Sequence, residues 1–137
     1  MKKILNGCVV VFVILEVLDI IVHGVILGPT YATMQNVWRS DMMEKMWILH
    51  IVKIVVAFLI TFIFSKGYEG KGIWEGVRYG FYIGLMLSMG YAFGSYASYN
   101  ISCQIAWIWF GFAMVEYIIA GIALALVFRK KEAPAAS

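Results

Sequence analysis

Six ionisable side chains lie inside long apolar stretches of the chain, and side chains of these types can bind and transfer protons. They are Glu16, Asp19 and His23 in the run 4–27, His50 and Lys53 in the run 46–64, and Glu116 in the run 105–128. A charge at bilayer depth costs from about 3 to more than about 10 kcal/mol unless it meets a partner or water. We therefore treat these residues as candidate functional residues.

Helical spacing places the residues of each run on a common face. At about 100° per residue, Glu16 and His23 are separated by roughly 20°, and Asp19 lies about 60° away. His50 and Lys53 share a face in the same way. We expect both faces to point into a helix bundle, because neither suits contact with lipid.

A helical rise of about 1.5 Å per residue predicts which residues meet at the same depth. The predicted pairs are His23 with His50 near the outer surface, Asp19 with Lys53 beneath them, and Glu16 with Glu116 near the midplane. The middle pair would be an ion pair, which lowers the cost of burying both charges. Two neighbouring carboxyls do not both ionise cheaply, so the third pair would retain a proton near neutral pH.

These pairs predict a site that handles protons. A carboxyl that keeps its proton near neutrality can release it to a neighbour, and histidines titrate near physiological pH and could pass the proton outward. Tyr117, directly after Glu116, could extend the network. The first functional hypothesis is a proton-linked transporter or channel for a small solute or ion.

Other interpretations remain open. The polar residues could form a hydrogen-bonded core that only fixes helix pairing, as in a non-catalytic structural or accessory subunit of a membrane complex. His23 and His50, on facing helices, could ligate a haem b or a metal ion, although no Glu-x-x-His spacing is present. Binding of a lipid or a quinone and capture of a soft metal by methionines near the outer face are further alternatives.

Neither an enzyme nor a nucleic-acid-binding protein is indicated. The chain shows no nucleotide motif and no Ser–His–carboxylate or Cys–His arrangement. The glycine-rich segment 66–76 lacks the Gly-Lys-Ser/Thr ending of a phosphate-binding loop. We interpret the formal net charge of +3 as a membrane-topology signal.

The elements that position these residues are expected to be membrane helices. Of 137 residues, 63% are hydrophobic and 14% charged, whereas soluble domains carry about 45–50% apolar and about 25% charged residues. Four apolar runs approach the roughly 20 residues that cross a bilayer: about 4–28, 46–65, 79–99 and 105–128. The predicted fold is all-α, a four-transmembrane-helix bundle in one domain, 1–131, with a disordered cytoplasmic tail at 132–137.

Positive charge predicts the orientation of the spans. Lysine and arginine gather before the first span, between the second and third, and after the fourth: Lys2, Lys3, Lys66, Lys71, Arg78, Arg129, Lys130 and Lys131. The opposite side carries Arg39 and Lys45. Both termini are therefore expected in the cytoplasm.

The segment between the first two spans predicts a short interfacial helix. Gly28 and Pro29 should end the first span, and apolar residues at helical spacing follow from Tyr31 to Met42. Asp41 has the position of an N-cap for the second span. Trp109, with other tryptophans, is expected in an outer aromatic belt.

Small residues in the third span predict close helix packing. Gly80, Gly84, Ser88 and Ala92 recur every four residues, and Gly90, Gly94 and Ser98 form a neighbouring line. The second line offers another interface, which favours a homo-oligomer or a partner membrane subunit.

The stretch Leu18-Asp-Ile-Ile-Val-His-Gly-Val-Ile-Leu-Gly-Pro-Thr-Tyr31, followed by Trp38-Arg39, resembles uncharacterised families of small bacterial four-span membrane proteins. That resemblance implies a bacterial inner-membrane location and no established activity. Small multidrug transporters are similar in having four spans and a glutamate in the first, as Glu16 is here. The chain departs from them at Asp19, His23, His50 and Lys53, so drug export is not carried over.

Overall fold

The computed structural model describes residues 1–34 and 36–129, and this part of the chain contains helices and no strand. The elements are α1 (Lys2–Asp19), the π-helix η1 (Ile20–Ile26), α2 (Gly28–Ala32), the 3-10 helix η2 (Met43–Lys45), α3 (Met46–Gly67), α4 (Ile73–Ser98) and α5 (Cys103–Phe128). The predicted all-α class is confirmed. The tail predicted at 132–137 lies outside the described residues.

Three of the described helices are long and apolar enough to cross a membrane. They are Lys2–Ile26, Met43–Gly67 and Cys103–Phe128, with mean hydropathies of 2.6, 2.5 and 2.1. These values support a protein of the membrane type. α4 is as long as α5, but its glycines, serines and tyrosines make it less apolar, and it does not join this group.

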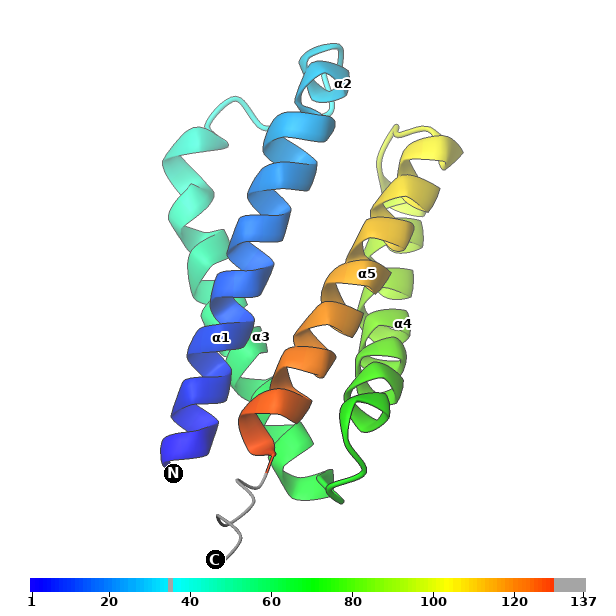
Figure 1. Cartoon of the computed structure of the whole chain (residues 1–137). Coiled ribbons are helices and arrows are strands. Elements are labelled where there is room, and N and C mark those ends of the chain that lie inside the picture. The colour runs from blue at the N-terminus through cyan, green and yellow to red at the C-terminus, as the bar shows by residue number, and fades with distance from the viewer. Residues whose placement is uncertain (35, 130–137) are drawn as a thin grey trace, which may run out of the picture.

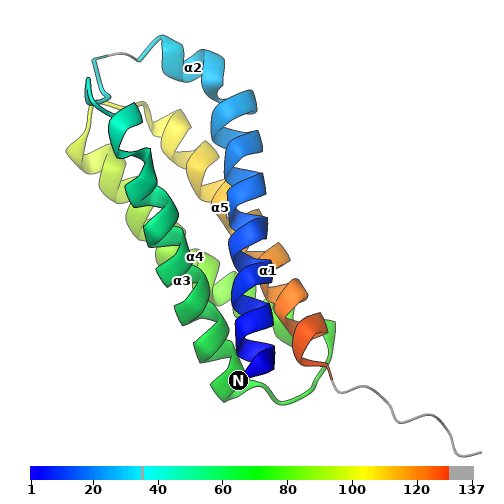
Figure 2. The same cartoon turned by 90° about the vertical axis from the view of Figure 1, so that its left-hand side faces the viewer.

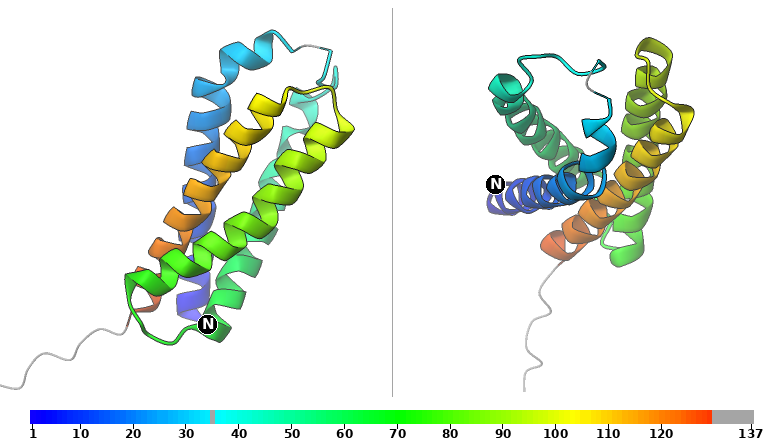
Figure 3. Two further views of the ribbon diagram at one scale, coloured as in Figure 1. Left: turned by 90° about the vertical axis from the view of Figure 1, so that its right-hand side faces the viewer. Right: turned by 90° about the horizontal axis from the view of Figure 1, so that it is seen from above.

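The long helices form two antiparallel pairs, α1 with α3 and α4 with α5, and α1 also packs against α5. The N-terminus and the α3–α4 loop lie at one end of the bundle, which we call the N-terminal end (Figure 1). The opposite end, the α2 end, carries α2 and the α4–α5 loop (Figure 2). Toward the α2 end, α3 diverges from α4 and α5, as the view along the bundle in Figure 3 shows.

Glycines on α4 bring its backbone against that of α5. A Cβ at Gly76 would overlap the carbonyl oxygen of Gly121, and one at Gly80 would overlap the carbonyl of Tyr117. A Cβ at Gly84 would lie 3.2 Å from atoms of Met114 and Tyr117. Small residues permit this close approach where the surrounding lipid provides no hydrophobic drive.

The predicted small-residue lines are therefore only partly used. Gly80, Gly84 and Ser88 are buried in the α4–α5 contact, and the Ser88 hydroxyl donates to the Gly84 carbonyl at 2.6 Å. A Cβ at Gly90 or Gly94 would meet nothing within 4 Å. These two glycines face away from α5 and contact no other helix among the described residues. The second interface predicted for them, with another subunit, stays a prediction.

At the N-terminal end, polar contacts join the two helix pairs. The Lys3 ammonium donates to the carbonyl oxygens of Phe128 at 2.9 Å and Arg129 at 3.2 Å. A cation suits the C-terminal end of a helix, where carbonyl groups lack intrahelical partners. The start of α1 is thereby attached to the end of α5.

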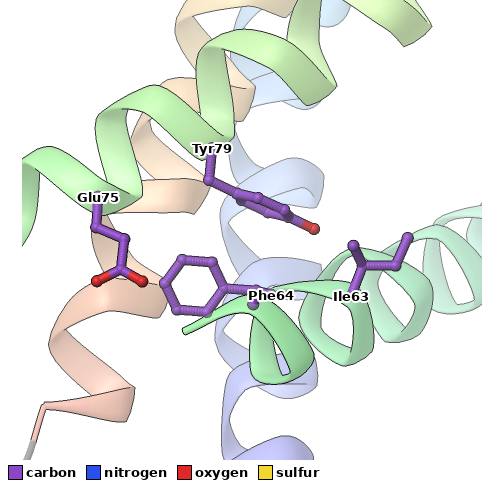
Figure 4. Close-up of a pocket in the computed structure, with 5 residues that line it drawn as sticks. Ile63, Phe64, Glu75 and Tyr79 are labelled. Atoms are coloured by element: carbon purple, nitrogen blue, oxygen red, sulfur yellow. The ribbon is translucent and has the colours of Figure 1, made fainter. Parts of the chain in front are cut away.

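The α3–α4 loop is held by a buried carboxylate. Glu75 accepts hydrogen bonds from the backbone N–H groups of Glu69 at 2.5 Å and Lys71 at 2.7 Å. Figure 4 shows Glu75 and Tyr79 of α4 beside Phe64 of α3, around a cavity of about 180 Å³. Both carboxylate oxygens are occupied by the loop, so the structure gives Glu75 an anchoring role.

The segment between α1 and α3 differs from the predicted interfacial helix. Pro29 lies in the first turn of α2, a position that proline favours because its missing N–H needs no partner there. The helix therefore starts at Gly28 and ends at Ala32, earlier than the apolar spacing indicated.

Asp41 does not act as the predicted N-cap. Its carboxylate instead pairs with Arg39 at 2.7 Å and Lys45 at 2.8 Å, and these hydrogen bonds lower the pKa of Asp41 to about 2. The Asp41 carboxylate thus binds these two cations and not the backbone N–H groups that an N-cap would bind. α3 consequently begins through the 3-10 turn η2, at Met46.

The α4–α5 seam yields a test of helix packing. We expect Gly80→Ala to lower the free energy of unfolding by about 1–3 kcal/mol, because the new methyl group would force two backbones apart. Thermal unfolding in detergent, followed by circular dichroism, measures this change.

Gly90→Ala is the matched control on the same helix. It adds the same methyl group in open space, so stability should stay the same or rise by up to about 1 kcal/mol. Equal destabilisation of the two variants would contradict the seam.

Candidate functional site

Glu16 joins α1 to α3 through two polar contacts. Its Oε1 lies 2.7 Å from Nδ1 of His50, and its Oε2 accepts from the Lys53 ammonium at 3.2 Å. The Glu16 side chain is 13% exposed, whereas the His50 side chain is 52% exposed. The carboxylate is thus enclosed, while the histidine lies on the open side of the site.

Lys53 also pairs with Asp19 and so bridges both carboxylates of α1. The Lys53 ammonium lies 2.8 Å from Oδ2 of Asp19. Side chains tilt toward the N-terminus of their own helix, and α3 starts at the α2 end. Lys53 therefore extends toward the α2 end, where Asp19 lies beyond Glu16.

His23 continues the polar chain toward the α2 end. Its Nε2 is 3.7 Å from Oδ1 of Asp19, and its Nδ1 is 2.6 Å from the Tyr31 hydroxyl. The Tyr31 oxygen also accepts from Nε1 of Trp109 at 2.6 Å. His23 lies in η1, and π-helical turns occur frequently at functional sites.

Glu116 enters the site from α5. It is 7% exposed, and its Oε1 has no hydrogen-bond partner among the described residues. The charges of Asp19 and Lys53 lie within electrostatic range of Glu116, and Tyr117 follows it on α5. A buried carboxyl oxygen without a partner is uncommon in folded proteins.

The structure brings Asp19 and Lys53 together, as the sequence predicted. The other two predicted pairs are not formed: His50 meets Glu16 in place of His23, and Glu16 meets His50 and Lys53 in place of Glu116. The depth argument assumed that both spans end at one level. In the structure, about three helical turns follow Glu16 to Ile26, whereas α3 begins about one turn before His50.

The observed pairing bears on the haem and metal alternative. His23 and His50 lie against different carboxylates, Asp19 and Glu16, so they do not face each other as ligands on the two sides of a haem would. Within residues 1–34 and 36–129, no three His, Cys, Asp or Glu side chains are placed to hold a metal ion. The geometry gives the bis-histidine interpretation no support.

Sequence reasoning missed two members of the site, Tyr31 and Trp109. Trp109 is 5% exposed and packs in the core, not in the predicted aromatic belt. A signal for Tyr31 was present, because Asp19, His23 and Tyr31 recur at multiples of four residues. The glycine and proline between His23 and Tyr31 concealed it, since they indicated the end of the helix.

The charges of the site do not balance when the histidines are neutral. Three carboxyl groups, Glu16, Asp19 and Glu116, face one lysine. One proton on Glu116 and one on His50 would make the group neutral. The arrangement can therefore bind two protons, or exchange a proton for another cation.

The fold and site define an all-helical protein of membrane type with a partly buried cluster of ionisable residues. Comparison with known protein families, curated proteins and solved structures finds no match for this chain. The resemblance to small bacterial four-span proteins stays a prediction.

Lys53 offers a direct test of this cluster. Lys53→Met should lower the free energy of unfolding by about 1–3 kcal/mol, because it leaves two partly buried carboxylates without their cation. Chemical unfolding in mixed micelles at neutral pH would measure the loss.

Lys45→Met provides the matched control, since it removes a lysine from an exposed ion pair with Asp41. Exposed pairs contribute about 0–1 kcal/mol. A Lys53→Met variant no less stable than Lys45→Met would refute the bridging role of Lys53.

Proposed function

We propose that this protein moves protons across a membrane in exchange for, or together with, a small cationic solute. The site comprises Glu16, Asp19, His50, Lys53 and Glu116. The observation that carries this proposal is the buried Glu116 carboxyl, which has an oxygen without a partner among the described residues and lies under the influence of Asp19 and Lys53.

The position of Glu116 favours a protonated carboxyl that can lose its proton. Burial penalises the ionised form, and the nearby Asp19 carboxylate penalises it further. Movement of a cation into the site, or transfer of charge toward Lys53, would remove that penalty. Proton release would then depend on the charge state of the site, as coupled transport requires.

A purely structural polar core explains this arrangement less well. Such a core is stabilising when all its members are hydrogen-bonded, and a partly satisfied one is costly. Glu16, Asp19 and Lys53 satisfy one another, but Glu116 adds a third carboxyl with no matching cation. A role in function would explain why this costly carboxyl is present.

The proposal includes four membrane crossings. α4 lies antiparallel to α5 through contacts that extend from Gly76 at one end to Ala92 at the other. If α5 crosses the bilayer, α4 crosses with it. The exposed tyrosines and open glycines of α4 would then need cover from another helix.

The membrane and orientation are also proposals. Lys2, Lys3, Lys66 and Lys71 lie at the N-terminal end, and the α2 end carries Arg39 and Lys45. Under the positive-inside rule, the N-terminal end faces the cytoplasm. We place the protein in a bacterial inner membrane on the basis of the sequence resemblance.

Proton flux in liposomes tests the proposed function. The purified protein should dissipate an imposed pH gradient, read by a trapped pH-sensitive dye, faster than empty liposomes. Glu116→Gln should reduce that rate at least tenfold, because an amide holds no exchangeable carboxyl proton (about 1.4 kcal/mol per factor of ten).

Glu44→Gln is the control, since Glu44 is an exposed carboxyl outside the site. It should retain the wild-type rate, and thermal unfolding should show that all variants fold. Equal flux for wild type and Glu116→Gln would overturn the proposal.

An accessory subunit of a membrane complex is a second candidate function, and the exposure of α3 favours it. Residues 47–52 are exposed on every side of the helix, including His50. A membrane helix with a half-exposed histidine in hydrogen-bond contact with Glu16 suggests cover by another protein helix. Co-purification in mild detergent would show a stoichiometric partner, and a monomer alone would remove this candidate.

A further inference from the structure

The contacts between Trp109, Tyr31 and His23 allow one continuous chain of hydrogen-bond donors. An indole N–H can only donate, so the Tyr31 oxygen accepts from Trp109 at 2.6 Å. The Tyr31 hydroxyl then keeps its own proton to donate, and Nδ1 of His23 lies 2.6 Å away. A neutral imidazole that accepts at Nδ1 carries its proton on Nε2.

The assigned Nε2 proton faces the carboxyl cluster. Nε2 of His23 is 3.7 Å from Oδ1 of Asp19, and Asp19 is bound to Lys53 at 2.8 Å. The chain of donors thus leads from Trp109 through Tyr31 and His23 to Asp19. The last separation exceeds a normal hydrogen bond, so this link is open in the structure.

Aromatic side chains surround the start of this chain. The Tyr31 ring stacks on His23 with centroids 5.8 Å apart, and Trp38 and Trp109 meet it edge-on at 5.1 and 6.3 Å. Tyr91 of α4 stacks on Trp109 at 5.3 Å. His23 of η1 and Trp109 of α5 therefore meet Tyr31 of α2, and α4 joins this cluster through Trp109.

Tyr31 suits a group that passes protons without ionising. Burial, together with the nearby Tyr91 and Asp19, raises the pKa of Tyr31 above its ordinary value despite the hydrogen bond from Trp109. The phenol stays protonated at every physiological pH. It can donate its proton to His23 only when another proton reaches its oxygen.

We propose that Tyr31 and His23 form a proton relay between the α2 end of the molecule and Asp19, with Trp109 as the positioning residue that sets its direction. This inference rests on the proposed proton-linked function. It assigns the route by which protons reach the carboxyl cluster, and it adds Tyr31 and Trp109 to the residues of the site.

The proton transfers balance at each step. A proton arriving at the Tyr31 oxygen forms a new O–H bond as the original hydroxyl proton moves to Nδ1 of His23. The imidazole then releases its Nε2 proton to an Asp19 oxygen. One proton reaches Asp19, and His23 is left as the Nδ1–H tautomer. The relay resets when the partly exposed imidazole gives its Nδ1 proton to water and takes up a proton from water at Nε2.

Several groups set the charge around His23. Asp19 lies on the same helical run, Lys53 approaches from α3, Tyr31 from α2 and Trp109 from α5. The negative charge of Asp19 attracts a proton toward the relay. The positive charge of Lys53 disfavours a positive charge on the neighbouring His23. Oδ2 of Asp19 is held by Lys53 at 2.8 Å, while Oδ1 lies 3.7 Å from Nε2 of His23. Transfer therefore requires His23 and Oδ1 of Asp19 to come closer, because this is the open link of the relay.

The first test reads the hydrogen bonds without any transport. Nitrogen-15 NMR of histidine-labelled protein in micelles, assigned with His23→Gln, should show His23 as the Nε2–H tautomer. Tyr31→Phe should abolish that preference, whereas Tyr82→Phe, which alters an exposed tyrosine, should preserve it. An Nδ1–H tautomer in the wild type, or no effect of Tyr31→Phe, would overturn the assigned direction.

The second test measures proton entry from the α2 side of liposomes of known orientation. Tyr31→Phe and His23→Gln should each slow entry at least tenfold, while the infrared carbonyl band of a protonated carboxyl, absent from Glu116→Gln, persists. Tyr82→Phe should match the wild type, and wild-type rates in Tyr31→Phe would overturn the relay.

The two tests separate this inference from the proposed function. A wild type that carries no protons but shows the Nε2–H tautomer removes both the transport function and the relay, and reduces the hydrogen-bonded chain to a structural anchor for α2. Flux that depends on Glu116 but not on Tyr31 or His23 leaves the function and removes the relay alone.

Discussion

The pairing of Lys53 with two carboxylates is the interaction on which the polar interior depends. One ammonium lies within 3.2 Å of Glu16 and 2.8 Å of Asp19, so it holds α1 and α3 in a single register. Every other ionisable member is positioned from that register: His50 meets Glu16, His23 lies beyond Asp19, and Glu116 faces the group from α5. A lysine is suited to this task, because its long stem reaches between residues on successive turns.

The two helix pairs are held together in different ways, one mainly by close backbone packing and the other with the help of polar pairs. The α4–α5 pair is held by backbone contact across glycines, and it contains few charges. The α1–α3 pair is joined by the ion pairs of Lys53 and by apolar packing nearer the N-terminal end, and α3 is thinly covered toward the α2 end. α5 contacts both pairs and brings Glu116 of the tightly packed pair toward the charges of the other. The site thus forms where a rigid helix pair meets a more open one.

Helix positions and the membrane type follow from composition and period, because a bilayer demands long apolar helices. The face shared by Glu16, Asp19 and His23 follows from the helical repeat in the same way. The register between α1 and α3 does not follow, since it depends on how far each helix extends past the other. The aromatic end of the site was also missed, because Gly28 and Pro29 signal a break in the chain but not that Tyr31 folds back over His23.

The bond between Lys3 and the last carbonyls of α5 spans nearly the whole chain, and it constrains the order of assembly. During synthesis α1 emerges before α3 and α4, whereas α5, its partner at that end, emerges after them. Glu16 and Asp19 can pair earlier, because Lys53 lies on α3, the next long helix to be synthesised. The first two long helices can therefore enter the bilayer as a charge-compensated hairpin, and the contact between the chain's two ends closes only when the final helix is complete.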